Sequence, residues 1–282
     1  MSRTNKYPQS PGPIGIFDSG YGGLTILRQI RSLMPQYDYL YLGDNARAPY
    51  GTRSFDIVYE FTLQAVQYLF ARGCHLVILG CNTASAKALR SIQQNDLPQM
   101  DPRRRVLGVI RPTVEIVGGI SQSRHVGIMA TMGTIRSATY NLEIAKLHPD
   151  IKVTGEACPM WVPLVENNEY DSPGADYFVQ KNIDNLLSRD PEIDCVILGC
   201  THYPLLLNKI RKYMPAGIHI IEQGRYVADS LQDYLRRHTE MAARITSGGT
   251  ATFLTTEQAG TFQSRATAFI GESLMAERVY LG

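Results

Sequence analysis

Two short segments of the chain nearly repeat each other, and this repeat constrains the fold more than any other feature. They are Val77–Thr83, with the sequence VILGCNT, and Val196–His202, with the sequence VILGCTH. Their cysteines, Cys81 and Cys200, lie 119 residues apart. Each segment is an apolar run typical of a buried strand, followed by Gly-Cys and the start of a helical pattern. A cysteine at a helix N-terminus can become a thiolate, so the repeat predicts two halves with two thiols directed at one substrate.

Strand-like and helical segments alternate along the chain, which is typical of parallel β-α-β units with helices on both faces of a sheet. The first strand is expected near residues 14–17, and a similar strand and turn follow at residues 125–134. We therefore predict an α/β fold. It consists of two similar, doubly wound, mainly parallel-sheet domains with the active site in the cleft between them.

The domain boundaries are placed where this pattern restarts. The first domain is expected to comprise residues 1–108 and 219–282, with residues 1–13 as a flexible tail. The second domain is expected to comprise residues 109–218. The segment after residue 218 is longer than the second domain needs, so it should return and complete the first.

Charge and cysteine content narrow the class of protein. The chain has 28 Lys and Arg residues against 26 Asp and Glu, a net charge of +2, and its densest basic run is Arg103–Arg105. We interpret that run as a solvated loop before a strand and expect no nucleic-acid partner. No run of 18 apolar residues predicts a membrane span, and no secretory signal is visible. Five cysteines, an odd number, favour reduced thiols and a cytoplasmic protein.

Polar side chains follow the predicted strands at the edge where parallel sheets bind ligands. Asp18 and Ser19 supply a carboxylate and a hydroxyl beside a glycine-rich turn. Further hydroxyl and amide groups lie near predicted helix starts, at Asn82, Thr83, Thr131, Thr134 and Thr201. Helix starts offer free N–H groups to anions, and these segments are poor in lysine and arginine. The site therefore favours small carboxylates over nucleotides.

Each of these residues also has a structural interpretation. Asp18 or Ser19 alone could cap a helix, and a single cysteine at a strand end is usually a small buried apolar residue. His202 could be structural, or could form half of a zinc site with Cys200, although the spaced Cys/His ligands of such sites are lacking. Two Gly-Cys segments at matching places favour the catalytic interpretation.

Six motifs, in order along the chain, resemble those of the glutamate racemases. They are Ile14–Thr25 (IGIFDSGYGGLT), Gly43–Gly51 (GDNARAPYG), Cys81–Ala86 (CNTASA), Thr131–Ser137 (TMGTIRS), Val162–Glu166 (VPLVE) and Leu198–Leu205 (LGCTHYPL). The resemblance extends from about residue 14 to residue 224, with a looser tail. Six ordered motifs are too many to attribute to chance.

The resemblance implies an isomerase that interconverts L- and D-glutamate without cofactor or metal and supplies D-glutamate for bacterial peptidoglycan. It implies that Cys81 and Cys200 are the acid/base residues on opposite faces of the α-carbon. Cys81 would be the base toward D-glutamate and Cys200 the base toward L-glutamate. Asp18 would assist Cys81, and His202 would assist Cys200.

The resemblance also implies further site residues and a homodimer. Acidic positions implicated in proton handling are matched by Asp44 and Glu166. The α-amino and α-carboxylate groups would be held by Ser19, Asn82, Thr83 and Thr201. The side-chain carboxylate would be held by the backbone of Pro49, Tyr50 and Gly51 together with Thr131 and Thr134.

The sequence departs from the family pattern in few places. Arg111 stands where Glu often precedes a Pro, Trp161 takes a place often held by Phe, and Glu222–Gly224 (EQG) replaces a common Asp-Ser-Gly. Three other functions stay open. They are a racemase of aspartate or another acidic substrate, a zinc-dependent hydrolase that uses Cys200 and His202, and a non-catalytic binding protein, for example one acting on DNA gyrase.

Overall fold

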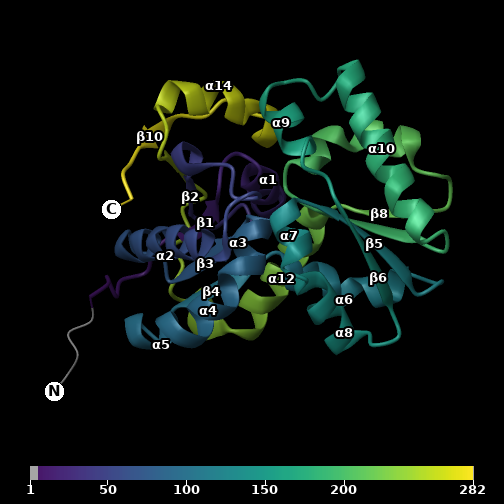
Figure 1. The fold of residues 1–282 in the computed structure, drawn as a ribbon. Helices are drawn as coiled ribbons and strands as arrows, with labels where there is room; N and C mark the ends of the chain where they lie inside the picture. The colour runs from purple at the N-terminus through teal and green to yellow at the C-terminus, as the bar shows by residue number, and fades with distance from the viewer. Residues whose placement is uncertain (1–5, 282) are drawn as a thin grey trace.

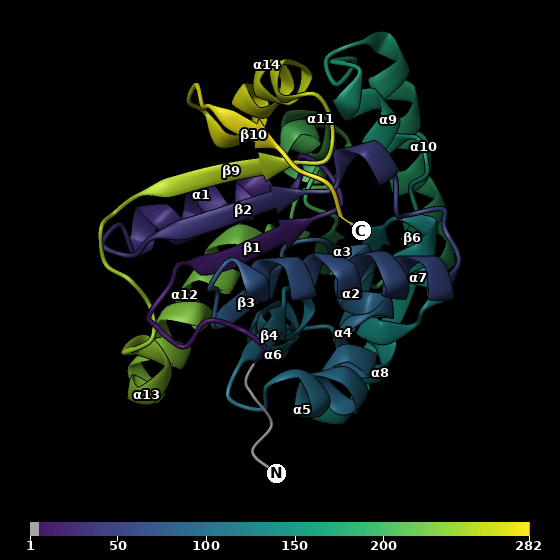
Figure 2. The same cartoon turned by 90° about the vertical axis from the view of Figure 1, so that its left-hand side faces the viewer.

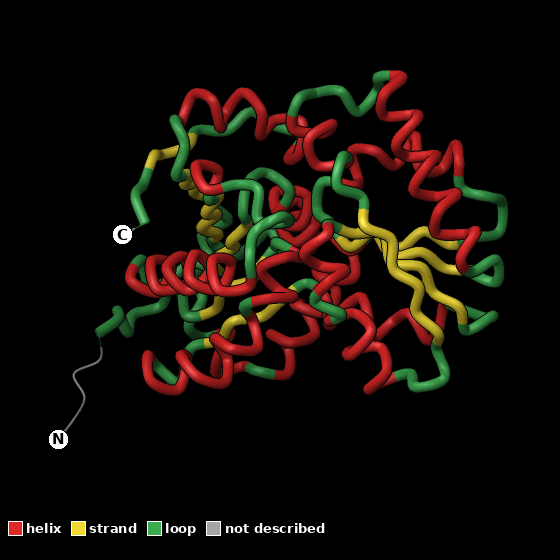
Figure 3. Tube along the Cα trace, in the orientation of Figure 1, coloured by secondary structure: helices red, strands yellow, loops and turns green. Residues whose placement is uncertain are grey.

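The computed structural model describes residues 6–281 and contains two sheets, one in each half of the molecule (Figures 1 and 3). The first has the order β10-β9-β2-β1-β3-β4, with β1 (Ile14–Asp18), β2 (Tyr39–Gly43), β3 (Leu76–Leu79), β4 (Arg105–Gly108), β9 (Ala251–Thr255) and β10 (Ala276–Arg278). The second has the order β6-β5-β7-β8, with β5 (His125–Ala130), β6 (Lys152–Ala157), β7 (Cys195–Gly199) and β8 (His219–Ile221). All these strand pairings are parallel, which confirms the predicted fold class.

The two halves repeat one arrangement of four strands. The order β2-β1-β3-β4 in the first sheet matches β6-β5-β7-β8 in the second. β3 and β7, the strands that lead into the repeated Gly-Cys segments, therefore occupy equivalent places in their sheets. The duplication inferred from sequence thus places Cys81 and Cys200 beyond equivalent strand ends.

Helices cover both faces of the first sheet (Figure 2) and both faces of the second (Figure 1). The first half carries α1 (Gly23–Leu33), η1 (Asn45–Arg47), α2 (Phe55–Ala71), α3 (Asn82–Lys87), α4 (Leu89–Ser91), η2 (Ile92–Asp96), α5 (Leu97–Met100), α12 (Gln223–Arg237), α13 (Thr239–Ala242) and α14 (Ala259–Ile270). The second half carries α6 (Ile110–Ile120), α7 (Met132–Arg136), α8 (Thr139–Leu147), α9 (Trp161–Glu166), α10 (Pro173–Arg189), η3 (Tyr203–Leu206) and α11 (Leu207–Tyr213). Within residues 6–281, no helix combines the length and apolar character needed to cross a membrane.

The alternating direction of side chains along the strands explains why helices lie on both faces of each sheet. Ile16 of β1 packs into a core with residues of α1 and α12, whereas its neighbour Phe17 packs into a second core with residues of α2. In β7, Ile197 packs with α6 and α8, and Leu198 packs with α10. Successive side chains of a strand point to opposite faces, so a fully apolar strand requires helices on both sides.

The chain crosses between the halves twice, from β4 to α6 and from β8 to α12. Residues 219–221 form β8 and pair with β7, so they belong to the second sheet and not to the first domain as predicted. After β8 the chain returns: α12 packs on α1, and β9 pairs with β2. From α12 onward, the last segment therefore packs on and pairs with elements of the first half.

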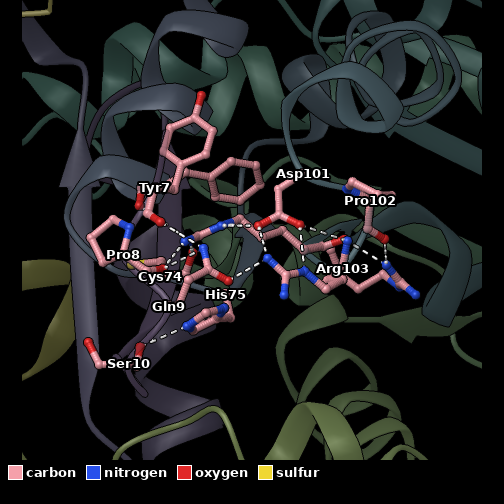
Figure 4. Close-up of polar contacts among 12 residues, drawn as sticks. Tyr7, Pro8, Gln9, Ser10, Cys74, His75, Asp101, Pro102 and Arg103 are labelled. Atoms are coloured by element: carbon pink, nitrogen blue, oxygen red, sulfur yellow. Dashed lines mark hydrogen bonds and ion pairs between the residues drawn. The ribbon is translucent and has the colours of Figure 1, made fainter. Parts of the chain in front are cut away.

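Residues 7–13 are anchored to the first half by the buried Tyr7 and Gly12 and by backbone carbonyls, although residues 8–11 are exposed. This anchoring contradicts the prediction of a flexible tail over this part of residues 1–13. Tyr7 is 5% exposed and meets the ring of Phe70 edge-on, with ring centroids 5.6 Å apart. Ser10 carbonyl lies 2.8 Å from His75 Nε2, and the Arg104 guanidinium donates to the Pro8 carbonyl (Figure 4). The remainder of the expected tail, residues 1–5, lies outside the described residues.

Arg104 anchors this segment and is fully buried, so the interpretation of Arg103–Arg105 as a solvated run is wrong for this residue. Its guanidinium donates to the carbonyls of Phe70 and Cys74 and forms an ion pair with Asp101 at 3.5 Å. A buried guanidinium requires such partners, because desolvating an unpaired charge is very costly.

Arg104→Met should lower the free energy of unfolding by about 3–5 kcal/mol, because it leaves buried carbonyls and a carboxylate without their donor. Urea unfolding followed by circular dichroism measures this loss. Arg103→Met is the matched control, since the Arg103 side chain is 50% exposed and also pairs with Asp101. It should cost less than about 1 kcal/mol. Equal losses in the two variants would contradict the anchoring role.

Candidate active site

A cavity of about 120 Å³ lies between the two halves, and both repeated cysteines line it. Most of the predicted site residues line it as well: Ser19, Pro49, Tyr50, Gly51, Cys81, Asn82, Thr83, Thr131, Glu166, Cys200, Thr201 and His202. Asp18, Asp44 and Thr134 lie outside its wall. Its volume is smaller than the roughly 300–1,000 Å³ of drug-sized ligand pockets, so it suits a small molecule.

A larger cavity, of about 550 Å³, includes neither cysteine. Arg111 lies in its wall, where the guanidinium pairs with Glu115 at 2.7 Å and Glu143 at 3.5 Å. This departure from the family pattern is therefore remote from the two thiols. The smaller cavity is the better candidate, because it gathers thiols, an imidazole and a carboxylate around one space.

Cys81 occupies the N-terminus of α3, directly after β3. Its Sγ accepts the N–H of Ala84 at 3.4 Å and lies 3.3 Å from Ser19 Oγ. Burial raises the pKa of the Cys81 thiol to about 12, and the nearby Asp18 carboxylate adds to the rise. With this pKa, the Cys81 thiol carries its proton at neutral pH.

Cys200 occupies the matching place after β7 and has a different partner. Its Sγ lies 3.9 Å from His202 Nδ1, and His202 Nε2 lies 3.0 Å from Glu166 Oε1 at the end of α9. Burial lowers the pKa of His202, but its interactions with Cys200 and Glu166 outweigh burial and raise the pKa to about 10. His202 is therefore an imidazolium at neutral pH and places a positive charge beside Cys200 Sγ.

Asp18 lies behind Cys81 at the end of β1 and is 1% exposed. Its Oδ2 accepts the N–H of Gly20 at 2.9 Å, whereas its Oδ1 is buried with no hydrogen-bond partner among residues 6–281. Burial raises the pKa of Asp18, and the positive charge of His202 opposes that rise. The carboxyl group of Asp18 therefore interacts electrostatically with both Cys81 and His202.

The glycine-rich turn after β1 allows the two halves to approach closely. A Cβ added to Gly22 would lie 2.5 Å from His202 Nδ1 and would also overlap Thr201. Thr25 Oγ1 donates across the same junction to the Thr201 carbonyl at 3.1 Å. A side chain at position 22 would displace the imidazole, which explains why the first motif needs glycine there.

Three threonine hydroxyls bridge the two halves on the other side of the cavity. Thr83 Oγ1 of α3 lies 3.0 Å from Thr131 Oγ1 and 3.4 Å from Thr134 Oγ1, which belong to the start of α7. Thr131 also accepts the N–H of Thr134 at 3.3 Å. Thr83 and Thr131 reach the cavity, and Thr134 supports them from behind.

Asp44 does not line the cavity, although the resemblance implied a role in proton handling. Its carboxylate accepts from Arg47 Nε at 2.7 Å, from Thr256 Oγ1 at 2.9 Å and from the Tyr50 hydroxyl. Tyr50 lines the cavity and Asp44 does not. The structure therefore connects Asp44 to the cavity through Tyr50.

Several residues of the wall were not predicted, namely Ala48, Thr52, Met132, Cys158, Pro159, Val162 and Pro163. Cys158 is 1% exposed. Val162 and Pro163 belong to a motif that resembled the family, so their place could have been inferred from that motif. No group of three or more His, Cys, Asp or Glu side chains that could hold a metal ion occurs in the described part of the chain.

Comparison with known proteins identifies a family that matches this chain. The Asp/Glu/hydantoin racemase family matches residues 24–245. A glutamate racemase of Ruegeria sp. (strain TM1040) is 41% identical over 274 residues, covering 94% of this chain and 98% of the relative. One of Roseobacter denitrificans is 39% identical, covering 91% and 96%.

Solved structures agree. A glutamate racemase isoform from Bacillus anthracis has a TM-score of 0.86 at 31% identity, covering 96% of this chain and 98% of that one. A Francisella tularensis glutamate racemase in complex with D-glutamate has a TM-score of 0.84 at 31% identity, with the same coverage. The chain therefore belongs to the glutamate racemases, within the Asp/Glu/hydantoin racemase family.

Proposed function

We propose that this isomerase interconverts L- and D-glutamate through two cysteine acid/base groups, without cofactor or metal. The observation that carries the proposal is that Cys81 and Cys200, beyond equivalent strands of duplicated halves, line one small cavity. Racemisation removes a proton from one face of the α-carbon and returns one to the other. One side chain cannot easily serve both faces, so two groups from opposing halves meet this need.

In any turnover, one cysteine must be a thiolate and the other a thiol. The raised pKa of Cys81, about 12, favours the thiol there, and Cys200 Sγ lies 3.9 Å from Nδ1 of the His202 imidazolium. With Cys81 as the acid, Cys200 is the group that removes the proton on its own face of the α-carbon. The family resemblance identifies the corresponding substrate as L-glutamate, and D-glutamate is converted after the protonation states are exchanged.

The substrate carboxylates would be bound by hydroxyl groups and backbone N–H groups. The cavity wall contains no Lys or Arg among the described residues, but it includes Ser19, Thr83, Thr131 and Thr201 and the N-termini of α3 and α7. Such donors bind small anions without fixed positive charge. Asn82 lies beside them and presents an amide to the α-amino and α-carboxylate groups.

The α-proton is far less acidic than a thiol, so the site must stabilise carbanion-like charge. Directed hydrogen bonds, the retained substrate ammonium and exclusion of water supply this stabilisation. The buried carboxyl group of Asp18 lies outside the cavity wall and would act on the reaction through its neighbour Cys81. Closure of the two halves around the substrate would exclude water.

The biological role follows from the chemistry and the family. We propose that the enzyme is cytoplasmic, forms a homodimer and supplies D-glutamate for peptidoglycan synthesis. A related racemase acting on aspartate is the alternative substrate assignment, and the experiment below distinguishes them.

The test is to incubate the purified enzyme with L-glutamate and, separately, with D-glutamate in D2O without added cofactor. Circular dichroism should show that both solutions lose optical activity, and NMR should show deuterium at the α-carbon. Aspartate is incubated in the same way. If aspartate incorporated deuterium while glutamate did not, the mechanism would stand and the substrate would change. Absence of exchange in both amino acids would overturn the proposed function.

A further inference from the structure

Gln223 lies at the second crossover, as the first residue of α12, and is 3% exposed. Its Nε2 donates to the Tyr140 hydroxyl at 2.8 Å and to Thr113 Oγ1 at 3.0 Å. Its Oε1 accepts from Asn82 Nδ2 at 2.6 Å. This one buried amide thus joins four helices. They are α12 and α6, which follow the two crossovers, α8 of the second half, and α3, which begins directly after Cys81.

Gln223, Tyr140 and Asn82 form a closed ring of hydrogen bonds. The Asn82 amide donates to Gln223, Gln223 donates to Tyr140, and the Tyr140 hydroxyl donates to Asn82 Oδ1 at 2.8 Å. Burial raises the pKa of Tyr140, so its hydroxyl keeps the proton that it donates. Within the ring, each member donates once and accepts once.

The backbone fixes the direction of this ring. The Val109 carbonyl can only accept, and it receives hydrogen bonds from Thr113 Oγ1 at 3.2 Å and from Gln223 Nε2 at 3.3 Å. If the Gln223 amide were turned over, its oxygen would face this carbonyl and its NH2 group would face the NH2 group of Asn82. Both contacts are repulsive, so the carbonyl at the first crossover determines the orientation of the Asn82 amide.

Asn82 keeps one hydrogen on Nδ2 and one lone pair on Oδ1 after the ring is formed. It also lines the cavity next to Cys81, so these remaining groups are available to a substrate. We infer that Gln223 is a positioning residue for racemisation, which orients Asn82 and links that orientation to the junction of the two halves. This inference rests on the proposed function of the cavity.

Gln223→Ala and Tyr140→Phe open the ring at different members and supply the test. Each should lower kcat/KM for both enantiomers by about tenfold, mainly through a higher KM, since about one directed hydrogen bond to the substrate is lost. Hydrogen exchange in residues 82–87 should become faster in both variants. The double variant should be no worse than the more impaired single variant, because the ring is already open.

Ser121→Ala is the control for stability alone. Ser121 is 2% exposed and donates to Asp194 at 2.7 Å, and neither residue lines the cavity. If the two ring variants lowered only the melting temperature, as this control should, or if their effects on kcat/KM were additive, the inference would be overturned. If the unmodified enzyme left glutamate unchanged, the proposed function would fail, and the exchange rates of residues 82–87 would decide the positioning role alone.

Discussion

Cys81→Ser and Cys200→Ser should each lower the rate of glutamate racemisation by more than about a thousandfold, with the fold retained. A serine hydroxyl is nearly isosteric with the thiol but is a far weaker acid. It stays protonated at neutral pH, so it cannot act as the base that one face of the α-carbon requires. Circular dichroism of L- and D-glutamate solutions measures the loss. Because the two enantiomers have equal free energy, kcat/KM must fall equally in both directions for either variant.

Two measurements should distinguish the loss of a catalytic thiol in these variants from a loss of structure. Cys195→Ser is the matched control, since Cys195 is a fully buried thiol of β7 outside the cavity wall. It should affect stability and leave turnover within about twofold. One-way elimination from a glutamate analogue with a β-leaving group needs one base, so each active-site variant should retain it for one enantiomer. Near-normal two-way turnover in either variant would exclude the two-thiol mechanism.

Much of the fold was predictable because its signals are local. The repeated VILGC segments are short, apolar and followed by helical patterns, and they became β3 and β7 with their cysteines at equivalent ends. Ligand binding at the carboxyl ends of parallel strands then placed Ser19, Thr131 and Thr201 at the cavity without any knowledge of tertiary contacts.

The remaining features depend on contacts between distant segments, which local patterns do not contain. Arg104 belongs to a basic run that is typical of a solvated loop, and its burial follows only from Tyr7 and neighbouring carbonyls packing over it. Asp44 follows a strand just as Asp18 does, yet its partners Arg47, Tyr50 and Thr256 hold it outside the cavity wall. β8 is too short for its pattern to show which sheet it joins.

Removing the imidazole at position 202 should change both the rate and its dependence on pH. His202→Asn should lower kcat/KM about 100- to 1,000-fold, since Cys200 loses the cation that stabilises its thiolate. In the unmodified enzyme, the pKa of His202 is raised to about 10, so activity should decline as the pH rises through that value. Steady-state rates from pH 6 to pH 10.5 measure both effects.

The stability of the folded protein should also depend on the protonation of His202. The linkage between protonation and folding gives the sign of this pH dependence. The folded-state pKa of His202, about 10, lies above the unfolded value of about 6.5. Its contribution to stability is therefore complete below about pH 6.5 and is lost as the pH rises toward 10. The melting temperature of His202→Asn should fall less steeply than that of the unmodified enzyme over this range. His219→Asn, at an exposed histidine of β8, should leave the pH dependence unchanged. Parallel curves for His202→Asn and the unmodified enzyme would show that position 202 carries no buried imidazolium, and the proposed role of His202 in assisting Cys200 would fall with it.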